Sequence, residues 1–189
     1  TPTTSPTCAQ SVSGWVTCWT SQSQAWKVPD VATPGSRPAP PSGLDATDLV
    51  VGVVSARWNN EIAERLTAGA HRAIGATGAA ARMASAPGAF ELPFVARVLI
   101  ESGDVDAVVV LGAVIRGETT HYEIVSQGCA QGIMQVQIAT GIPIGLGILT
   151  VENMDQAVAR SEAAGGHNVG EEATLAAIEM ALLAGRTRA

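Results

Sequence analysis

The amino-acid sequence predicts a three-layer αβα domain, with a four-stranded parallel sheet between two layers of helices and a disordered N-terminal extension. Apolar runs rich in β-branched residues, such as residues 49–54 and 106–111, have the continuous hydrophobicity of strands that are covered on both faces. Each run precedes a segment with helical spacing of apolar residues, and strands that alternate with helices form parallel sheets with right-handed crossovers. Residues 1–46, in contrast, are rich in Thr, Ser, Pro and Gln and show no hydrophobic periodicity.

The expected elements alternate along the chain. The strands are residues 49–54, 80–85, 106–111 and 142–149, and the helices are residues 59–77, 90–101, 120–140, 153–162 and 168–184. Three helices begin with a pair typical of a capping box, in which a Thr or Asn is followed three positions later by Glu or Gln: Thr120 with Glu123, Asn153 with Gln156, and Asn168 with Glu171. Gly141 and Gly185 are expected to end the helices that precede them.

The change in composition divides the chain into a low-complexity tail or linker, residues 1–46, and an α/β domain, residues 47–189. Prolines near the end of the tail are expected to keep it extended. Three tryptophans are unusual in so polar a segment and could dock on the domain or on a partner: Trp15, Trp19 and Trp26. The composition nevertheless favours a disordered extension.

Charge and composition exclude several classes of function. The net charge of −6 and the pI near 5.0 argue against nucleic acid or an anionic membrane as a partner. Lys27 is the only lysine, so residues 46–189 hold no Schiff-base lysine and no Walker-type phosphate loop. The three cysteines form neither a disulfide framework nor a zinc spacing, and Cys129 is expected to be an inert buried thiol. We find no apolar run of transmembrane length and no secretory signal, and we expect a cytoplasmic protein.

Ligands of parallel sheets bind beyond the carboxyl ends of the strands, which selects residues 55–60, 86–91, 113–121 and 149–153. The third of these loops carries Arg116, Glu118, Thr119 and His121 between a buried strand and a helix. The first turn of a helix offers free N–H groups and a positive dipole, which bind anions and favour the neutral form of an imidazole. A surface His that caps a helix is the simpler alternative, but the clustering of polar side chains favours a catalytic turn.

The other loops carry weaker signals. Trp58 could stack on a planar ring, although a lone Trp at a strand end more often serves packing. Residues 89–91 could hold hydroxyl groups through amides and a carboxylate, or could simply begin a helix. Arg160 matters for function only if the fold brings it towards the turn at Gly117. Two further histidines are expected to be ordinary surface residues: His71 and His167.

Four segments together resemble lumazine synthase, the penultimate enzyme of riboflavin biosynthesis. They are PGAFELP at 87–93, GAVIRGETTHYE at 112–123, GILTVEN at 147–153 and QAVAR at 156–160. The resemblance runs from about residue 48 to residue 183. It implies condensation of 5-amino-6-(D-ribitylamino)uracil with 3,4-dihydroxy-2-butanone 4-phosphate to give 6,7-dimethyl-8-ribityllumazine, phosphate and water, without a metal or an organic cofactor.

The resemblance also implies roles for particular residues. Trp58 would stack on the pyrimidine, and His121 would transfer protons. The ribityl chain and the ring would be bound by Ala89, Phe90, Glu91, Ala113, Val114 and Ile115. The phosphate would be held by Glu118, Thr119 and Arg160. Leu146 would close the ring pocket from a neighbouring subunit.

The resemblance further implies assembly into homopentamers, decamers or shells of twelve pentamers, with each active site between adjacent subunits. The length of residues 160–170 favours isolated pentamers. Val169 stands where the family commonly has Lys near the phosphate, which removes a cation that His167 could partly replace. Two other hypotheses remain: a flavodoxin-like module that binds a flavin or lumazine without catalysis, and a cage-forming scaffold that uses the tail to bind a partner.

Overall fold

A computed structural model describes residues 43–188, and the predicted tail with its tryptophans lies almost entirely outside the described residues. The described chain folds into a four-stranded sheet in which all neighbouring strands are parallel, in the order β2-β1-β3-β4. The strands are β1 (Val50–Ala56), β2 (Ala80–Ala86), β3 (Ala107–Ile115) and β4 (Ile144–Val151). The predicted three-layer class is therefore confirmed.

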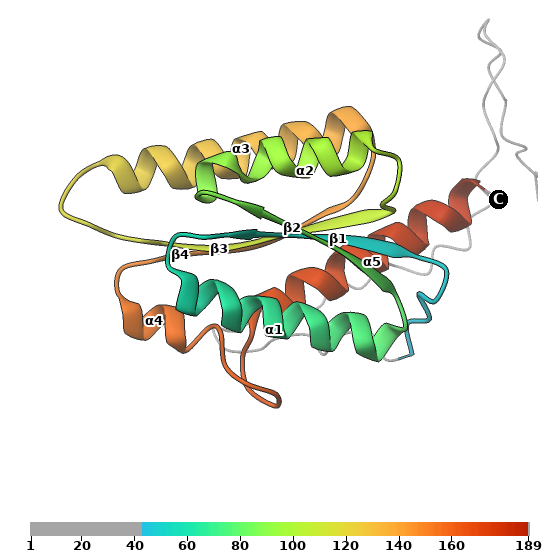
Figure 1. The fold of residues 1–189 in the computed structure, drawn as a ribbon, viewed down its shortest axis with the longest axis horizontal. Helices are drawn as coiled ribbons and strands as arrows, with labels where there is room; N and C mark the ends of the chain where they lie inside the picture. The colour runs from blue at the N-terminus through green and yellow to red at the C-terminus, as the bar shows by residue number, and fades with distance from the viewer. Residues whose placement is uncertain (1–42, 189) are drawn as a thin grey trace, which may run out of the picture. The chain divides into compact units, whose positions relative to one another are not determined.

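The helices cover both faces of the sheet (Figure 1). The short 3-10 helix η1 (Ala89–Glu91) leads into α2 (Leu92–Glu101), which lies with α3 (His121–Thr140) on one face. On the other face lie α1 (Asn60–Thr77), α4 (Met154–Val158) and α5 (Val169–Arg188). No helix among residues 43–188 is long and apolar enough to cross a bilayer.

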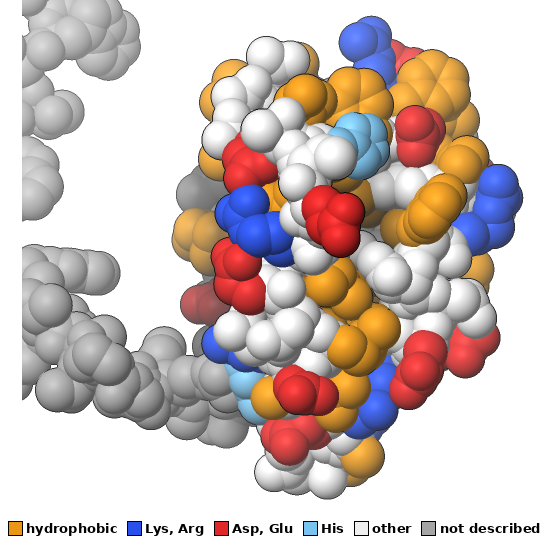
Figure 2. Space-filling model, turned by 90° about the vertical axis from the view of Figure 1, so that its left-hand side faces the viewer, with side chains coloured by type: hydrophobic (Ala, Val, Ile, Leu, Met, Phe, Trp, Pro, Cys, Tyr) orange, Lys and Arg blue, Asp and Glu red, His pale blue; other side chains and the backbone are white. Residues whose placement is uncertain are grey.

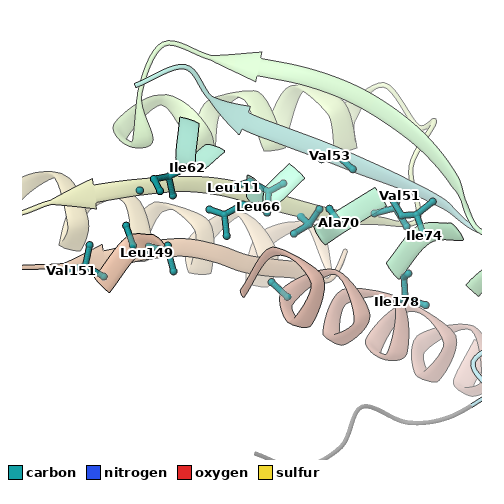
Figure 3. Close-up of a cluster of buried hydrophobic side chains, with 14 of the residues drawn as sticks. Val51, Val53, Ile62, Leu66, Ala70, Ile74, Leu111, Leu149, Val151 and Ile178 are labelled. Atoms are coloured by element: carbon teal, nitrogen blue, oxygen red, sulfur yellow. The ribbon is translucent and has the colours of Figure 1, made fainter. Parts of the chain in front are cut away.

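Alternate residues of the central strands serve two separate cores, as the two-residue period of a strand requires. On β3, Val109 and Leu111 pack on the side of α1 and α5, whereas Val108 and Val110 pack on the side of α2 and α3. Figure 3 shows the first core, in which side chains of the sheet meet those of α1 and α5. Each central strand therefore has apolar side chains on both faces, which explains its uninterrupted hydrophobic sequence.

The packed chain begins slightly before the predicted domain boundary. Ala46 is buried at 1% exposure, and its N–H donates to the carbonyl of Thr77 at 2.8 Å. Leu44 also packs against the core beside α1 and α5. Their composition placed both residues in the predicted tail, because two apolar residues are too few to establish a periodicity.

The ends of the helices differ from the predictions in three places. The predicted capping box at Thr120 is wrong: the Thr120 side chain makes no capping bond, and Glu123 pairs with Arg116 instead. Helix α4 ends at Val158, and α5 continues through Gly185. A glycine can remain within a helix when its φ angle stays negative, and Gly185 is not among the positive-φ glycines, whereas Gly141 is (φ 69°) and ends α3 as predicted.

The start of α5 is anchored against α1. Asn168 is 2% exposed, and its Oδ1 accepts the N–H of Glu171 at 3.1 Å, as the predicted cap requires. Its Nδ2 donates to the carbonyl oxygens of Arg65 at 3.0 Å and Glu162 at 2.9 Å. Gly170 permits the close approach of α5 to α1, because a Cβ at this position would lie 2.2 Å from the backbone oxygen of Leu66.

Candidate active site

A cleft of about 710 Å³ opens where β1 and β3 end. Its walls come from the corner after β1, from η1, from the last residues of β3 and from the first turns of α3. The lining residues are Trp58, Asn59, Gly88, Ala89, Phe90, Glu91, Ala113, Val114, Ile115, His121, Ile124 and Val125. Three of the four loops selected from the sequence therefore meet in one cavity. Figure 2 views this end of the sheet, where exposed hydrophobic side chains lie between acidic and basic ones.

Asn59 fixes the corner after β1. Its backbone is left-handed (φ 56°, ψ 48°), a conformation that Asn tolerates better than most side chains. Its Nδ2 donates to the carbonyl of Ala113 at 2.8 Å and so joins this corner to β3. Trp58, directly before it, is 73% exposed, so its indole is available to a ligand rather than used in the core.

Helix η1 forms another wall of the cleft. The carboxylate of Glu91 accepts the N–H of Gly88 at 3.0 Å, which holds the turn after β2 in shape. Phe90 is 55% exposed, and its ring lies against α3 where residue 128 is glycine; a Cβ there would be 2.7 Å from the ring. Phe90 therefore joins η1 to α3 and presents an aromatic surface to the cleft.

The strand β3 continues further than predicted. Ala113, Val114 and Ile115 were expected in a loop but lie on the strand, because β4 pairs with them up to Ile115 and Val151. Backbone at the end of a strand is more rigid than a loop. The central wall of the cleft is thus preformed.

His121 is the first residue of α3 and faces the cleft. Its side chain is exposed, and its N–H donates to Thr119 Oγ1 at 3.4 Å. An exposed imidazole at the mouth of a cavity can exchange protons with both a bound molecule and water. Among residues 43–188 no group of three His, Cys, Asp or Glu residues could hold a metal ion.

Arg116 does not face the cleft. Its guanidinium pairs with Glu123 and, through Nε, with Glu152 at 2.8 Å, and it stacks over the Tyr122 ring at 4.1 Å. The hydrogen bond from Arg116 holds the pKa of the Glu123 carboxyl below its usual range, and the bonds to Glu123 and Glu152 raise the pKa of Arg116.

Four of the predicted site residues lie outside the cleft lining. Glu118 and Thr119 are exposed on the turn before α3. Arg160 is exposed beyond α4, where its Nη1 donates to the carbonyl of Gln156 at 3.0 Å. Leu146, 48% exposed, lines a separate cavity of about 270 Å³ between β4 and α3. The described chain therefore brings together most of the residues expected around the pyrimidine, but Leu146 and Arg160 lie apart from them.

Several lining residues were missed from the sequence. An Asn directly before a helix is a signal for Asn59, whereas Ile124 and Val125 resemble ordinary apolar helix residues and offer none. Cys129 is buried as expected, and burial raises the pKa of its thiol to about 11. His71 is exposed as expected, but His167 is half-buried, with Nε2 3.7 Å from a Glu172 oxygen, so it is not an ordinary surface residue.

Comparison with known proteins gives the same assignment as the four sequence segments. Residues 48–184 match the family model for 6,7-dimethyl-8-ribityllumazine synthase. The chain belongs to this family. It is 45% identical over 139 residues to the 6,7-dimethyl-8-ribityllumazine synthase of Deinococcus deserti, covering 72% of this chain and 88% of that one. It is 46% identical over 143 residues to the enzyme of the same name from Kineococcus radiotolerans, covering 75% and 88%. The Clavibacter sepedonicus protein of that name is 43% identical over 144 residues, covering 76% and 89%.

Proposed function

We propose that the cleft between β1 and β3 is the active site in which this enzyme condenses 5-amino-6-(D-ribitylamino)uracil with 3,4-dihydroxy-2-butanone 4-phosphate. The products are 6,7-dimethyl-8-ribityllumazine, phosphate and water, as in its family. The observation that carries the proposal is that one cavity gathers Trp58, the η1 residues, the end of β3 and His121.

The pyrimidine fits this cavity by its shape and polarity. The exposed indole of Trp58 can stack on a planar ring. Backbone groups of residues 113–115 can bond to the polar edge of the ring, and Glu91 with the amides of η1 can bind the ribityl hydroxyls. These contacts orient the primary amine of the substrate towards His121.

The chemistry needs proton transfers more than a protein nucleophile. The substrate's own primary amine attacks the ketone, and the carbonyl oxygen leaves as water when the imine forms. After phosphate is eliminated, the ribitylamino nitrogen attacks the remaining carbonyl and closes the ring with loss of a second water. An imidazole can carry protons at this step and when phosphate is eliminated. The absence of lysine after residue 46 is therefore no obstacle, and much of the acceleration comes from holding two reactants together.

We propose that the phosphate lies against the turn at residues 117–120, where Glu118 and Thr119 present backbone amides. Arg116 cannot neutralise it, because two carboxylates already surround that guanidinium. Arg160 carries the charge that the site needs, but it does not line the cleft of its own subunit. We therefore propose that Arg160 and Leu146 serve the cleft of an adjacent subunit in a homopentamer.

The proposal is tested by mixing the protein with both substrates and following the fluorescence of the lumazine product. Replacing His121 with Ala should lower the rate by about 10²-fold or more, the usual size of a lost general acid or base, while the pyrimidine still binds. Unchanged turnover in this variant would contradict the assigned role. If the protein were only a binding module, the unaltered protein would bind the pyrimidine but would produce no lumazine.

Two further experiments test the assembly and the tail. Native mass spectrometry should give a pentamer or a multiple of it, and a monomer with full activity would contradict the shared site. Removing residues 1–42, which keeps Leu44 and Ala46 in the core, should leave turnover unchanged, whereas a scaffold that depends on its tail would lose its partner. We also propose a cytoplasmic location, supported by the scattered cysteines and tested by cell fractionation.

A further inference from the structure

Arg116 lies where the end of β4, the corner after β4 and the first turn of α3 meet. Its backbone N–H donates to the carbonyl of Val151 at the end of β4, at 2.9 Å. Its side chain reaches Glu152 in the corner after β4 and Glu123 in the first turn of α3, and it covers the ring of Tyr122. One guanidinium thus ties the start of α3 to the end of the edge strand.

The pairing with Glu123 closes the turn that carries His121. Arg116 precedes this turn, and Glu123 lies two residues beyond His121. Between them the turn is exposed, and the side-chain hydrogen bond inside it, from the His121 N–H to Thr119, is long at 3.4 Å. The conformation of the turn therefore depends strongly on the pair that joins its ends.

Glu123 depends on Arg116 in return. Its Oε2 is buried without a hydrogen-bond partner among the described residues, although Oε1 pairs with Arg116. The Glu123 side chain is also 39% exposed, so without its counter-charge it can turn to solvent at little cost. Without Arg116, Glu123 would turn to solvent, and the first turn of α3 would lose its attachment.

The contact with Glu152 extends the same attachment to α4. The N–H of Glu152 donates to Gln156 Oε1 at 3.0 Å, and Asn153 Oδ1 accepts the N–H of Gln156 at 3.0 Å. Arg160 follows directly after this helix. The corner held by Arg116 thus supports the segment that presents Arg160.

We propose that Arg116 is a positioning residue, which holds His121 and the amides of residues 117–120 in alignment by pairing with Glu123 and Glu152. The inference rests on the proposed function. An arginine suits the position because its planar fork can serve two carboxylates and an aromatic face at once, which a lysine ammonium cannot. Arg116 contacts no substrate in this arrangement.

The first test compares the kinetics of Arg116→Met and Arg116→Lys with those of the native protein. A displacement of about 1 Å in a reacting group can cost about 100-fold, so Arg116→Met should lower kcat by about 10- to 100-fold. The KM for the pyrimidine should change by less than about twofold, because Trp58 and η1 are untouched. Arg116→Lys should restore only part of the rate. The control is Arg97→Met, which breaks an exposed pair with Glu101 and should leave kcat unchanged.

The second test separates positioning from direct phosphate binding. Glu152→Gln removes the negative charge that pairs with Arg116, whereas Asp155→Asn removes a nearby exposed charge that makes no ion pair with Arg116. Under the proposal, Glu152→Gln lowers kcat/KM and Asp155→Asn does not. Combining Glu152→Gln with Arg116→Met should add little to the single effects, as residues that act as one unit are not additive. If Arg116 bound phosphate directly, Glu152→Gln would release it and improve phosphate affinity, which would overturn the proposal.

Amide hydrogen exchange tests the attachment without relying on turnover. Arg116→Met should accelerate exchange at residues 117–121 relative to Arg97→Met. If the native protein made no lumazine, the proposed function would fail while this measurement still decided whether Arg116 holds the turn. Exchange and kcat in Arg116→Met equal to those in Arg97→Met would refute the inference. If Arg116→Met failed to fold, Glu152→Gln would decide, since it leaves the pair with Glu123 in place.

Discussion

Replacing Asn168 with Ala should destabilise the domain far more than its position at a helix start suggests. Asn168 makes three hydrogen bonds, one to the Glu171 N–H and two to the carbonyls of Arg65 and Glu162, and it is 2% exposed. Loss of a cap costs about 1 kcal/mol. Each of the two lost hydrogen bonds to the partly buried carbonyls costs about 1 kcal/mol more. The expected loss is therefore about 3 kcal/mol.

The matched control is Asn153→Ala, which removes a cap of the same type from an exposed position. Asn153 Oδ1 accepts a single N–H, that of Gln156, so the expected loss is about 1 kcal/mol or less. For a domain of this size, about 3 kcal/mol corresponds to a fall in Tm of roughly 6–12 °C. Thermal unfolding of both variants is followed by circular dichroism at one fixed protein concentration, because association also shifts Tm. An Asn168→Ala loss no larger than that of Asn153→Ala would refute the reasoning from burial.

Three further outcomes are expected. Gly145→Ala should destabilise the fold by about 2 kcal/mol or more, because the added Cβ would lie 2.1 Å from the backbone oxygen of Ala173. Gly75→Ala, in open space on α1, should instead stabilise the fold by about 0.5–1 kcal/mol. Urea titration of both variants checks this. Burial raises the pKa of the Cys129 thiol from 9.0 in the unfolded chain to about 11 in the folded chain, so the free energy of unfolding should fall as the pH rises across this interval. Unfolding curves measured at several pH values check this, with the two N-terminal cysteines replaced by serine. The variant Cys129→Ala should not show the fall. Val169→Lys should lower the KM for the phosphate substrate by roughly 3- to 10-fold. The N–H of residue 169 donates to the Arg160 carbonyl at 3.0 Å, so a lysine at this position adds a second cation beside Arg160. An unchanged KM would place the phosphate elsewhere.

The sequence alone was sufficient for much of the cleft. Continuous apolar runs identify the buried strands, and the rule that ligands bind beyond parallel strand ends then selects the loops that carry Trp58, Phe90 and His121. These three residues do line one cavity. The roles assigned to them remain predictions.

Partners distant in sequence were decided only by the folded chain. The length of β3 depends on pairing with β4 up to Val151, and the choice of Glu123 between a helix cap and Arg116 depends on where Glu152 brings the guanidinium. The separation of Arg160 from the cleft has the same origin, since Arg160 follows the end of α4 at Val158 and is exposed outside the cleft lining. Local sequence determines local backbone preferences. These long-range contacts depend instead on the relative energies of alternative pairings between groups that come together only in the completed sheet.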